Sequence, residues 1–324
     1  MFLLLVWATI FLVSAVVLGK AADYFVDTAT IIGLFLGMSP IMIGIIILSL
    51  GTSIPELVVS ILAALSGNTG IIIANVVGSN ITNIVLVLGV AALISTKLKI
   101  TYKNIHINFF VGATFLLFIV IQDGTFSLPE AIVFFAVAAF YMWGTHVEER
   151  QTREAKRIEK IVEEEHPEKN KKKRLKPSKR HIAIFIISPI AIFLGAQYML
   201  LALEELASML NVGSEVIAAV GVAFGTSLPE LATTVSLARK GHSDAIIGNI
   251  MGSNIFNIVL VMSIPALLTQ IDIPVHILTV EMPILIMVTL LYFFITIDKE
   301  LSRPKGLLLF AFYVLFVAKA LNLF

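Results

Sequence analysis

Two glutamates lie within long apolar stretches of this chain, and they are the residues best placed to do chemistry. Glu56 follows Pro55 in the segment GTSIPEL, and Glu230 follows Pro229 in the segment GTSLPEL. A carboxylate at the centre of a membrane helix costs about 2.5–3.5 kcal/mol or more, so it commonly marks an ion or proton path. A single buried glutamate can also be a structural group bonded to a neighbour, but two copies in one motif favour a functional site.

The two prolines favour a cation site in particular. A proline inside a helix removes the hydrogen bond to the carbonyl four residues earlier, which leaves the carbonyls of Gly51 and Gly225 free. Freed carbonyls, Thr and Ser hydroxyls and a carboxylate together form the oxygen ligand set that calcium and sodium prefer. A proline kink can also be purely mechanical, but a kink followed directly by glutamate in two places favours ligation.

A polar stripe with a period of four residues occurs twice, within NVVGSNITN and NIMGSNIFN. Residues four apart share one face of a helix, so each stripe can face the glutamates. Such a stripe can also serve as a hydrogen-bonding surface between helices, and Gly78 and Gly252 would permit close helix approach. Beside the glutamate motifs, coordination is the better interpretation. The two stripes consist of Asn75, Ser79 and Asn83, and of Asn249, Ser253 and Asn257.

All four motifs belong to one internal repeat. Residues 41–94 match residues 215–268 without a gap, at a constant offset of 174 positions. Shared Gly, Thr, Ser, Pro, Glu and Asn in register cannot arise from an apolar composition alone. Five predicted spans separate equivalent positions, so the second copy crosses the membrane in the opposite sense. Inverted repeats of this kind build many secondary transporters, whose binding site lies near the membrane midplane.

Apolar segments make up most of the remaining chain. The 324 residues are 58% hydrophobic and 14% charged, whereas soluble domains carry about 25% charged residues. A helix of roughly 20 residues spans a hydrocarbon core about 30 Å thick. We therefore predict an all-α integral membrane protein with ten transmembrane helices arranged as two inverted five-helix repeats. The predicted spans are 1–18, 29–64, 70–95, 104–121, 127–146, 181–202, 212–238, 245–269, 275–297 and 305–323.

Charged residues divide and orient this bundle. We expect a first five-helix repeat over 1–146, a charged cytoplasmic linker over 147–181 that begins as a helical extension of the fifth span, and a second repeat over 182–324. Cytoplasmic loops hold an excess of Lys and Arg. We therefore predict a multi-pass cell-membrane protein with both termini outside. This orientation places every basic residue except Lys319 on the inner side. We interpret the apolar stretch 1–18 as a retained span, not a signal peptide.

Several function classes are excluded by what the sequence lacks. The chain has no cysteine, which excludes disulfides and thiolate metal sites. It contains no phosphate-binding loop, HExxH or GxSxG motif, so we expect neither an enzyme nor an ATP-driven pump. We expect no cofactor, no nucleic-acid partner and no obligatory protein partner. Calcium and sodium ions are the expected substrates, and the lipid bilayer is the expected surroundings.

The paired motifs GTSIPE/GTSLPE and GSNITN/GSNIFN resemble the two alpha-repeats of the cation/calcium exchanger superfamily, and especially its sodium/calcium exchanger branch in bacteria and archaea. The resemblance implies alternating access in which several sodium ions exchange for one calcium. It implies that Glu56 and Glu230 are the central carboxylate ligands. The supporting ligands that it implies are the Thr52 and Thr226 carbonyls, Ser53, Ser227, Ser79, Asn83, Ser253 and Asn257.

One position departs from part of that family. Several relatives, including potassium-dependent ones, carry Asp where this chain has Asn257. Two formal negative charges then remain at the predicted site, and we expect exchange that does not require potassium. A calcium/proton antiporter and, from a different class, a cation channel remain alternatives. A sodium gradient separates exchanger from channel, because only an exchanger uses it to move calcium uphill.

Overall fold

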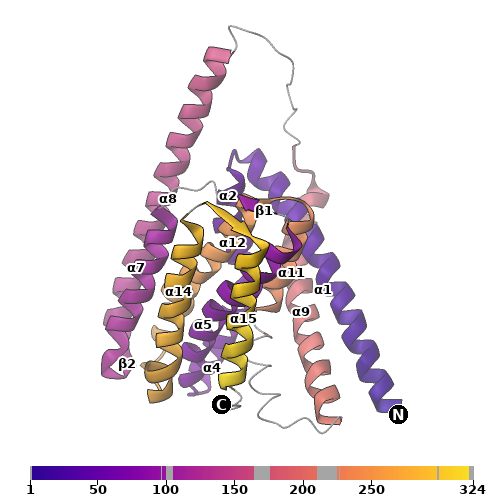
Figure 1. Ribbon diagram of the computed structural model, residues 1–324, viewed down its shortest axis with the longest axis vertical. Coiled ribbons are helices and arrows are strands. Elements are labelled where there is room, and N and C mark those ends of the chain that lie inside the picture. The colour runs from indigo at the N-terminus through magenta and orange to yellow at the C-terminus, as the bar shows by residue number, and fades with distance from the viewer. Residues whose placement is uncertain are drawn as a thin grey trace.

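The computed structural model describes residues 2–95, 97–99, 105–163, 176–209, 225, 227–297 and 299–320. These residues form a bundle of roughly aligned helices with a few short strands (Figure 1). The helical elements are α1 (Phe2–Phe35), α2 (Pro40–Met42), η1 (Ile43–Leu48), α3 (Ser49–Thr52), α4 (Ile54–Leu65), α5 (Gly70–Thr82), η2 (Asn83–Val87), α6 (Leu88–Ile94), α7 (Ile105–Val120), η3 (Ile121–Asp123), α8 (Leu128–Glu163), α9 (Lys179–Met209), α11 (Leu228–Arg239), α12 (Ser243–Phe256), η4 (Asn257–Val261), α13 (Ser263–Ala266), η5 (Ile277–Glu281), α14 (Met282–Thr296) and α15 (Arg303–Ala320). The strands are β1 (Lys97–Lys99), β2 (Thr125–Phe126), β3 (Ile271–Asp272) and β4 (Glu300–Ser302).

Most of these helices are long and apolar enough to cross a membrane. Seven described helices meet that requirement, or eight when the bent pair Pro40–Thr52 and Ile54–Leu65 is counted as one span. A multi-span, all-helical membrane protein is therefore confirmed. The count of ten is not confirmed, because part of the predicted span 212–238 lies outside the described residues. α15 occupies the position of the predicted tenth span.

The boundaries predicted for the first two spans, 1–18 and 29–64, are wrong. α1 is one continuous helix of 34 residues, so Lys20 lies inside a helix and not in a connection. The charged residues that follow Gly19 looked like a loop in the sequence. Two of them, Asp23 and Asp27, instead meet polar partners on the distant α11 and its end, which keeps this part of α1 helical.

The turn between α1 and α2 has clear local causes. Gly37 has a φ of 79°, a left-handed conformation that commonly ends helices. The Gly37 N–H donates to the Leu34 carbonyl at 3.0 Å. Ser39 then caps the next helix, its hydroxyl accepting a bond from the Met42 N–H at 3.4 Å, and Pro40 takes the first helical position. The second membrane segment consequently begins at Pro40.

The helices that carry the predicted polar stripes form the centre of the bundle. In the most apolar stretches of Gly70–Ile94 and Ser243–Ala266, 83% and 94% of the residues are buried inside the protein. The corresponding shares are only 11% for α1 and 22% for α9. These two outer helices pack along each other at one edge of the bundle (Figure 1). Both stripes thus lie on the helices that are best shielded from lipid.

The internal repeat is visible in how equivalent elements are arranged. Shifting α1 by the offset of 174 gives the range of α9, and Figure 1 shows the two running in opposite directions. The strands obey the same relation, since β1 and β2 shift onto β3 and β4. β1 pairs antiparallel with β4 and β2 with β3, so each pairing joins the two halves. This arrangement is what an inverted repeat requires.

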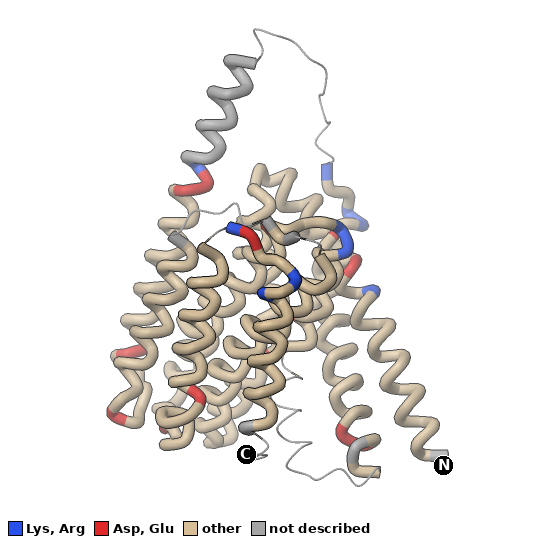
Figure 2. The backbone as a smooth tube through the Cα atoms, viewed as in Figure 1, with Lys and Arg blue, Asp and Glu red and all other residues tan. Residues whose placement is uncertain are grey.

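α8 continues well past the apolar part of its span. It runs for 36 residues to Glu163, which confirms the helical extension expected after position 146. The predicted linker residues 164–175 lie outside the described residues. Among the described residues, Lys and Arg gather at the end of the bundle from which α8 projects (Figure 2). That end is called the linker side below.

Candidate cation-binding site

The first glutamate motif lies at a break between α3 and α4. Ser53 separates the two helices with φ −87° and ψ 2°, and the helix axes differ by 40°. Pro55 has no N–H to continue the helix, so α4 starts anew with Pro55 in its first turn. Glu56 then lies in that first turn, where the positive end of the helix dipole stabilises a carboxylate.

The second motif has the same local geometry. Ser227 has φ −92° and ψ 5°, α11 starts at the next residue, and Pro229 and Glu230 lie in its first turn. The predicted ligand Thr226 is outside the described residues, so its position is not described. Both prolines therefore lie in the first turn of a helix, directly before a buried glutamate.

Both carboxylates are fully buried. Glu56 and Glu230 have 0% exposure, and they lie close enough for their charges to repel each other. None of their four carboxylate oxygens has a hydrogen-bond partner among the described residues. The Glu230 carboxylate lies near the Thr52 and Ser53 side chains of the other half. Buried carboxylates without partners are strongly unfavourable, so a cation or a proton must compensate them.

Hydroxyl and amide oxygens surround this pair. Ser53 and Ser227 are buried, and their hydroxyls have no hydrogen-bond partner in the described part of the chain. Ser253, from the second stripe, lies 3.3 Å from Thr52, oxygen to oxygen, and joins the two halves directly. Ser79 is also buried, at the equivalent place on α5. Hydroxyls from both halves, those of Thr52 and Ser253, therefore meet at the first break.

The two asparagines at the ends of the stripes each present an oxygen. Asn83 and Asn257 are 0% exposed. The Oδ1 atom of each has no partner among the described residues. The described residues contain no group of three or more His, Cys, Asp and Glu side chains that could hold a metal ion. A cation here would be held by two carboxylates together with neutral oxygens, which suits calcium and sodium.

The stripe residues nearest the helix starts have a different role. Asn75 donates to the Glu56 carbonyl at 2.9 Å and to the Ser60 hydroxyl at 3.0 Å. Asn249 donates to the Thr234 hydroxyl at 3.5 Å, the equivalent pairing in the second half. These two side chains fasten the stripe helices to the glutamate helices. The hydrogen-bonding interpretation of the stripe thus holds for them.

A close helix contact forms at one of the two predicted glycines. A Cβ added at Gly252 would lie 2.5 Å from both the Ile45 carbonyl oxygen and the Ser49 hydroxyl, so only glycine fits. A Cβ at Gly78 would meet no described atom within 4 Å. The repeat pairs Gly78 with the segment 210–224, which lies outside the described residues.

Two π-helical turns at the site have no counterpart in our sequence predictions. η2 begins at Asn83 and η4 at Asn257, and both have the sequence NIVLV. The Met262 N–H donates to the Asn257 carbonyl five residues earlier, at 3.1 Å. Such wide turns are rare and are frequently found at functional sites. No local residue type signals them, although the identical pentapeptides already showed that the two ends are equivalent.

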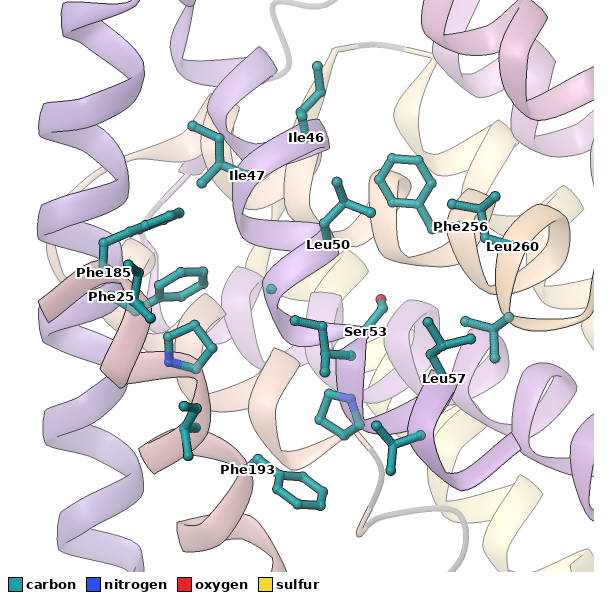
Figure 3. Close-up of a pocket in the computed structure, with 18 of the residues that line it drawn as sticks. Phe25, Ile46, Ile47, Leu50, Ser53, Leu57, Phe185, Phe193, Phe256 and Leu260 are labelled. Atoms are coloured by element: carbon teal, nitrogen blue, oxygen red, sulfur yellow. The ribbon is translucent and has the colours of Figure 1, made fainter. Parts of the chain in front are cut away.

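An apolar cavity of about 590 Å³ flanks the first break (Figure 3). Ser53 is the one labelled residue in Figure 3 that brings an oxygen into it. Phe25 of α1 and Phe185 of α9 stack there with ring centroids 5.6 Å apart. A Cβ at Gly51 would collide with the Phe25 ring, so α1 packs directly against the break. Apart from Ser53, the described residues that line this cavity between the break and the outer helices are apolar.

A bundle in which two equivalent helices each start beside a buried glutamate at an oxygen-rich centre has the architecture of secondary transporters built from inverted repeats. Comparison with known families agrees. The sequence model of the family described as sodium/calcium exchanger protein matches residues 6–146 and 180–321. The chain belongs to this sodium/calcium exchanger family.

Individual relatives support the same assignment. The chain is similar to sodium/calcium exchanger MaX1 of Methanosarcina acetivorans, with 34% identity over 95% of this chain and 96% of the relative. It is 30% identical to membrane protein MJ0091 of Methanocaldococcus jannaschii, over 95% and 96% of the two chains. Among solved structures, the sodium-calcium exchanger NCX_Mj soaked with Na⁺ and Sr²⁺ matches with a TM-score of 0.79 and 27% identity, covering 97% of this chain and 99% of that one.

Proposed function

We propose that this protein is a secondary antiporter that exchanges sodium for calcium across a membrane. The observation that carries the proposal is the pair Glu56 and Glu230, fully buried, with four carboxylate oxygens that have no partner among the described residues. One calcium ion neutralises the pair. Family membership and the named exchangers among its relatives favour this function over a calcium/proton antiporter or a cation channel.

We further propose the ligand set. The two carboxylates bind the ion from both sides, and neutral oxygens complete the six to eight ligands that calcium takes. The backbone carbonyls at positions 52 and 226 are included because the resemblance to the exchanger family implies them, and Thr52 is the last residue of α3 before the break. The remaining ligands proposed are Ser53, Ser227, Ser79, Asn83, Ser253 and Asn257.

The domain plan and orientation are proposals of the same kind. We assign residues 1–146 and 182–324 to the two inverted repeats and 147–181 to a cytoplasmic linker, with both termini outside. The gathering of Lys and Arg on the linker side supports this orientation. Because the chain lacks cysteine, a single cysteine introduced at position 170 is a clean probe. Its labelling by an impermeant reagent added outside intact cells would contradict the orientation.

The function is tested by calcium flux in proteoliposomes containing the purified protein. With calcium equal on both sides, an imposed sodium gradient should drive calcium uphill against the direction of sodium movement. A channel would give no net uphill movement. A proton antiporter would respond to a pH gradient and ignore sodium. Calcium movement that is indifferent to the sodium gradient would sink the proposal.

A further inference from the structure

The geometry points to Asn80 and Asn254 as positioning residues that turn the amide oxygens of Asn257 and Asn83 toward the transported ion. This inference rests on the proposed function and adds two residues to it. Neither residue is in the ligand set. Both are buried, with 0% and 1% exposure, at equivalent places on α5 and α12.

The orientation of Asn80 is fixed by a backbone atom. Its Nδ2 atom donates to the main-chain carbonyl oxygen of Asn254 at 3.2 Å. A carbonyl oxygen can only accept a hydrogen bond, so the end of the Asn80 amide that meets it must be the NH₂ group. The Asn80 Oδ1 atom is then necessarily at the other end.

That oxygen in turn fixes the ligand. Asn257 donates from Nδ2 to the Asn80 Oδ1 atom at 3.3 Å. Because the NH₂ group of Asn257 is held there, its Oδ1 atom faces away from Asn80, and it has no partner among the described residues. A neutral amide can bind a cation only through its oxygen. Asn80 therefore decides whether Asn257 presents its oxygen or its NH₂ group.

The second half repeats the bond between the positioning residue and the ligand. Asn83 donates from Nδ2 to the Asn254 Oδ1 atom at 3.3 Å, and the Asn83 Oδ1 atom has no described partner. The two bonds cross between the halves, so each repeat orients the ligand of the other. A purely structural pairing of α5 with α12 would not require both ligand amides to expose an unpaired buried oxygen, which is costly in itself.

The decisive test is a double-mutant cycle on equilibrium calcium binding by the purified protein. Asn80→Leu removes both bonds at similar volume and lets the Asn257 amide turn. We expect calcium affinity to fall roughly five- to tenfold, as for the loss of one neutral ligand. A carboxylate presents an oxygen whichever way it turns, so in the Asn257→Asp background the same Asn80→Leu change should cost less than about twofold.

The matched control is Thr289→Val, another buried polar-to-apolar change, at a residue of α14 that is outside the proposed ligand set and whose hydroxyl has no described partner. It should leave calcium affinity unchanged. Equal losses from Asn80→Leu in both backgrounds would mean that Asn80 acts only through packing and would overturn the inference. If Asn80→Leu does not fold, Asn254→Leu with and without Asn83→Asp gives an independent cycle with the same two outcomes.

Binding also separates this inference from the proposed function. Wild-type protein that binds no calcium at equilibrium would contradict the proposed function, and the positioning role would fall with it. Calcium binding that is unaffected by Asn80→Leu and Asn254→Leu would contradict the positioning role alone and leave the exchanger proposal intact.

Discussion

The two halves of the chain match at the candidate cation site and differ where α1 meets α11. At the site, equivalent residues make equivalent or crossed contacts, as Asn80 with Asn257 and Asn254 with Asn83 do. At the linker side, Lys240 donates to the Asp23 carbonyl at 2.9 Å and to the Asp27 carboxylate at 2.7 Å. The equivalents of Asp27, Ser236 and Lys240 are Leu201, Leu62 and Ser66, which cannot form such an ion pair.

This difference separates two requirements on the molecule. A site that binds the same ions from either side of the membrane must offer equivalent ligands toward both sides. A ligand set related by a two-fold axis meets this requirement. The contacts that close the two sides face different solutions and carry no such constraint. Ser236 adds a 2.6 Å bond to the Asp23 carboxylate, so on the linker side α1 and α11 meet partly through polar contacts. We therefore expect the two halves to match closely at the site and to differ in the contacts at the two ends of the bundle.

The largest expected effect tests the equality of the two glutamates. Glu56→Gln and Glu230→Gln keep the shape of the side chain and remove the charge that offsets calcium. Each should lower sodium-driven calcium flux at least about 100-fold, since losing one partner of a buried ion pair costs about 3–5 kcal/mol. Glu130→Gln, at a glutamate that caps α8 by accepting from the Ser127 N–H, is the control and should transport normally. Loss of flux in only one of the two glutamine variants would contradict the symmetric site.

Membrane voltage tests the charge that the two halves share. Asn83 and Asn257 are both neutral, so the site has two formal negative charges and is neutral with one calcium bound. Loading with more than two sodium ions makes it positive, so exchange should carry current. Each charge moved across the full potential corresponds to about 2.3 kcal/mol per 100 mV. Flux in proteoliposomes under an imposed potential, with and without potassium, measures this. Voltage-independent flux, or a need for potassium, would contradict the charge assigned.

Thr52→Ala tests whether the site uses a backbone or a side-chain oxygen at the break. The carbonyl remains in the mutant, and the hydroxyl's contacts with Ser253 and with the Ser49 carbonyl, both 3.3 Å, are lost. We expect calcium affinity to fall by no more than about fivefold, the value of one neutral hydrogen bond. Serine at the same position should restore wild-type binding. A loss as complete as that in the glutamate mutants would assign the hydroxyl itself to the ion.

The smallest expected effect concerns the unequal ends. Lys240→Met removes the ion pair, whose Lys and Asp27 side chains are 26% and 58% exposed. Exposed pairs contribute about 1 kcal/mol or less. The apparent calcium affinity measured from the linker side should therefore change by roughly two- to fivefold, and that from the other side should not change. Arg239→Met, at the neighbouring residue, is the control. Equal changes in apparent calcium affinity on both sides would show that the ion pair affects the whole protein and not the linker side alone.

The proposed ligands could be predicted from the sequence because they depend on residue type and occur in a repeat. Glutamate directly after proline, twice and in apolar surroundings, is hard to reconcile with a purely structural role. The continuity of α1 was missed because Lys20, Asp23 and Asp27 resemble a loop in the sequence. The partners of Asp23 and Asp27 lie more than 200 positions later in the chain. Likewise, the crossed asparagine bonds depend on how α5 meets α12. A local sequence pattern cannot predict whether the oxygen or the NH₂ group of an asparagine side chain faces a given neighbour.

A π-helical turn is geometrically an α-helix into which one residue has been inserted. At η2 and η4 the extra residue rotates everything downstream relative to the stripe, by about 100°. The polar face that includes Asn83 ends at η2, because every side chain of α6 is apolar. The turn instead decides which of those side chains are buried, and Gly89 and Ala92 consequently meet Gly306 of α15. Removing one residue from NIVLV would rotate α6 by about 100° and turn these two small residues away from α15, so the close contact between the two helices would be lost.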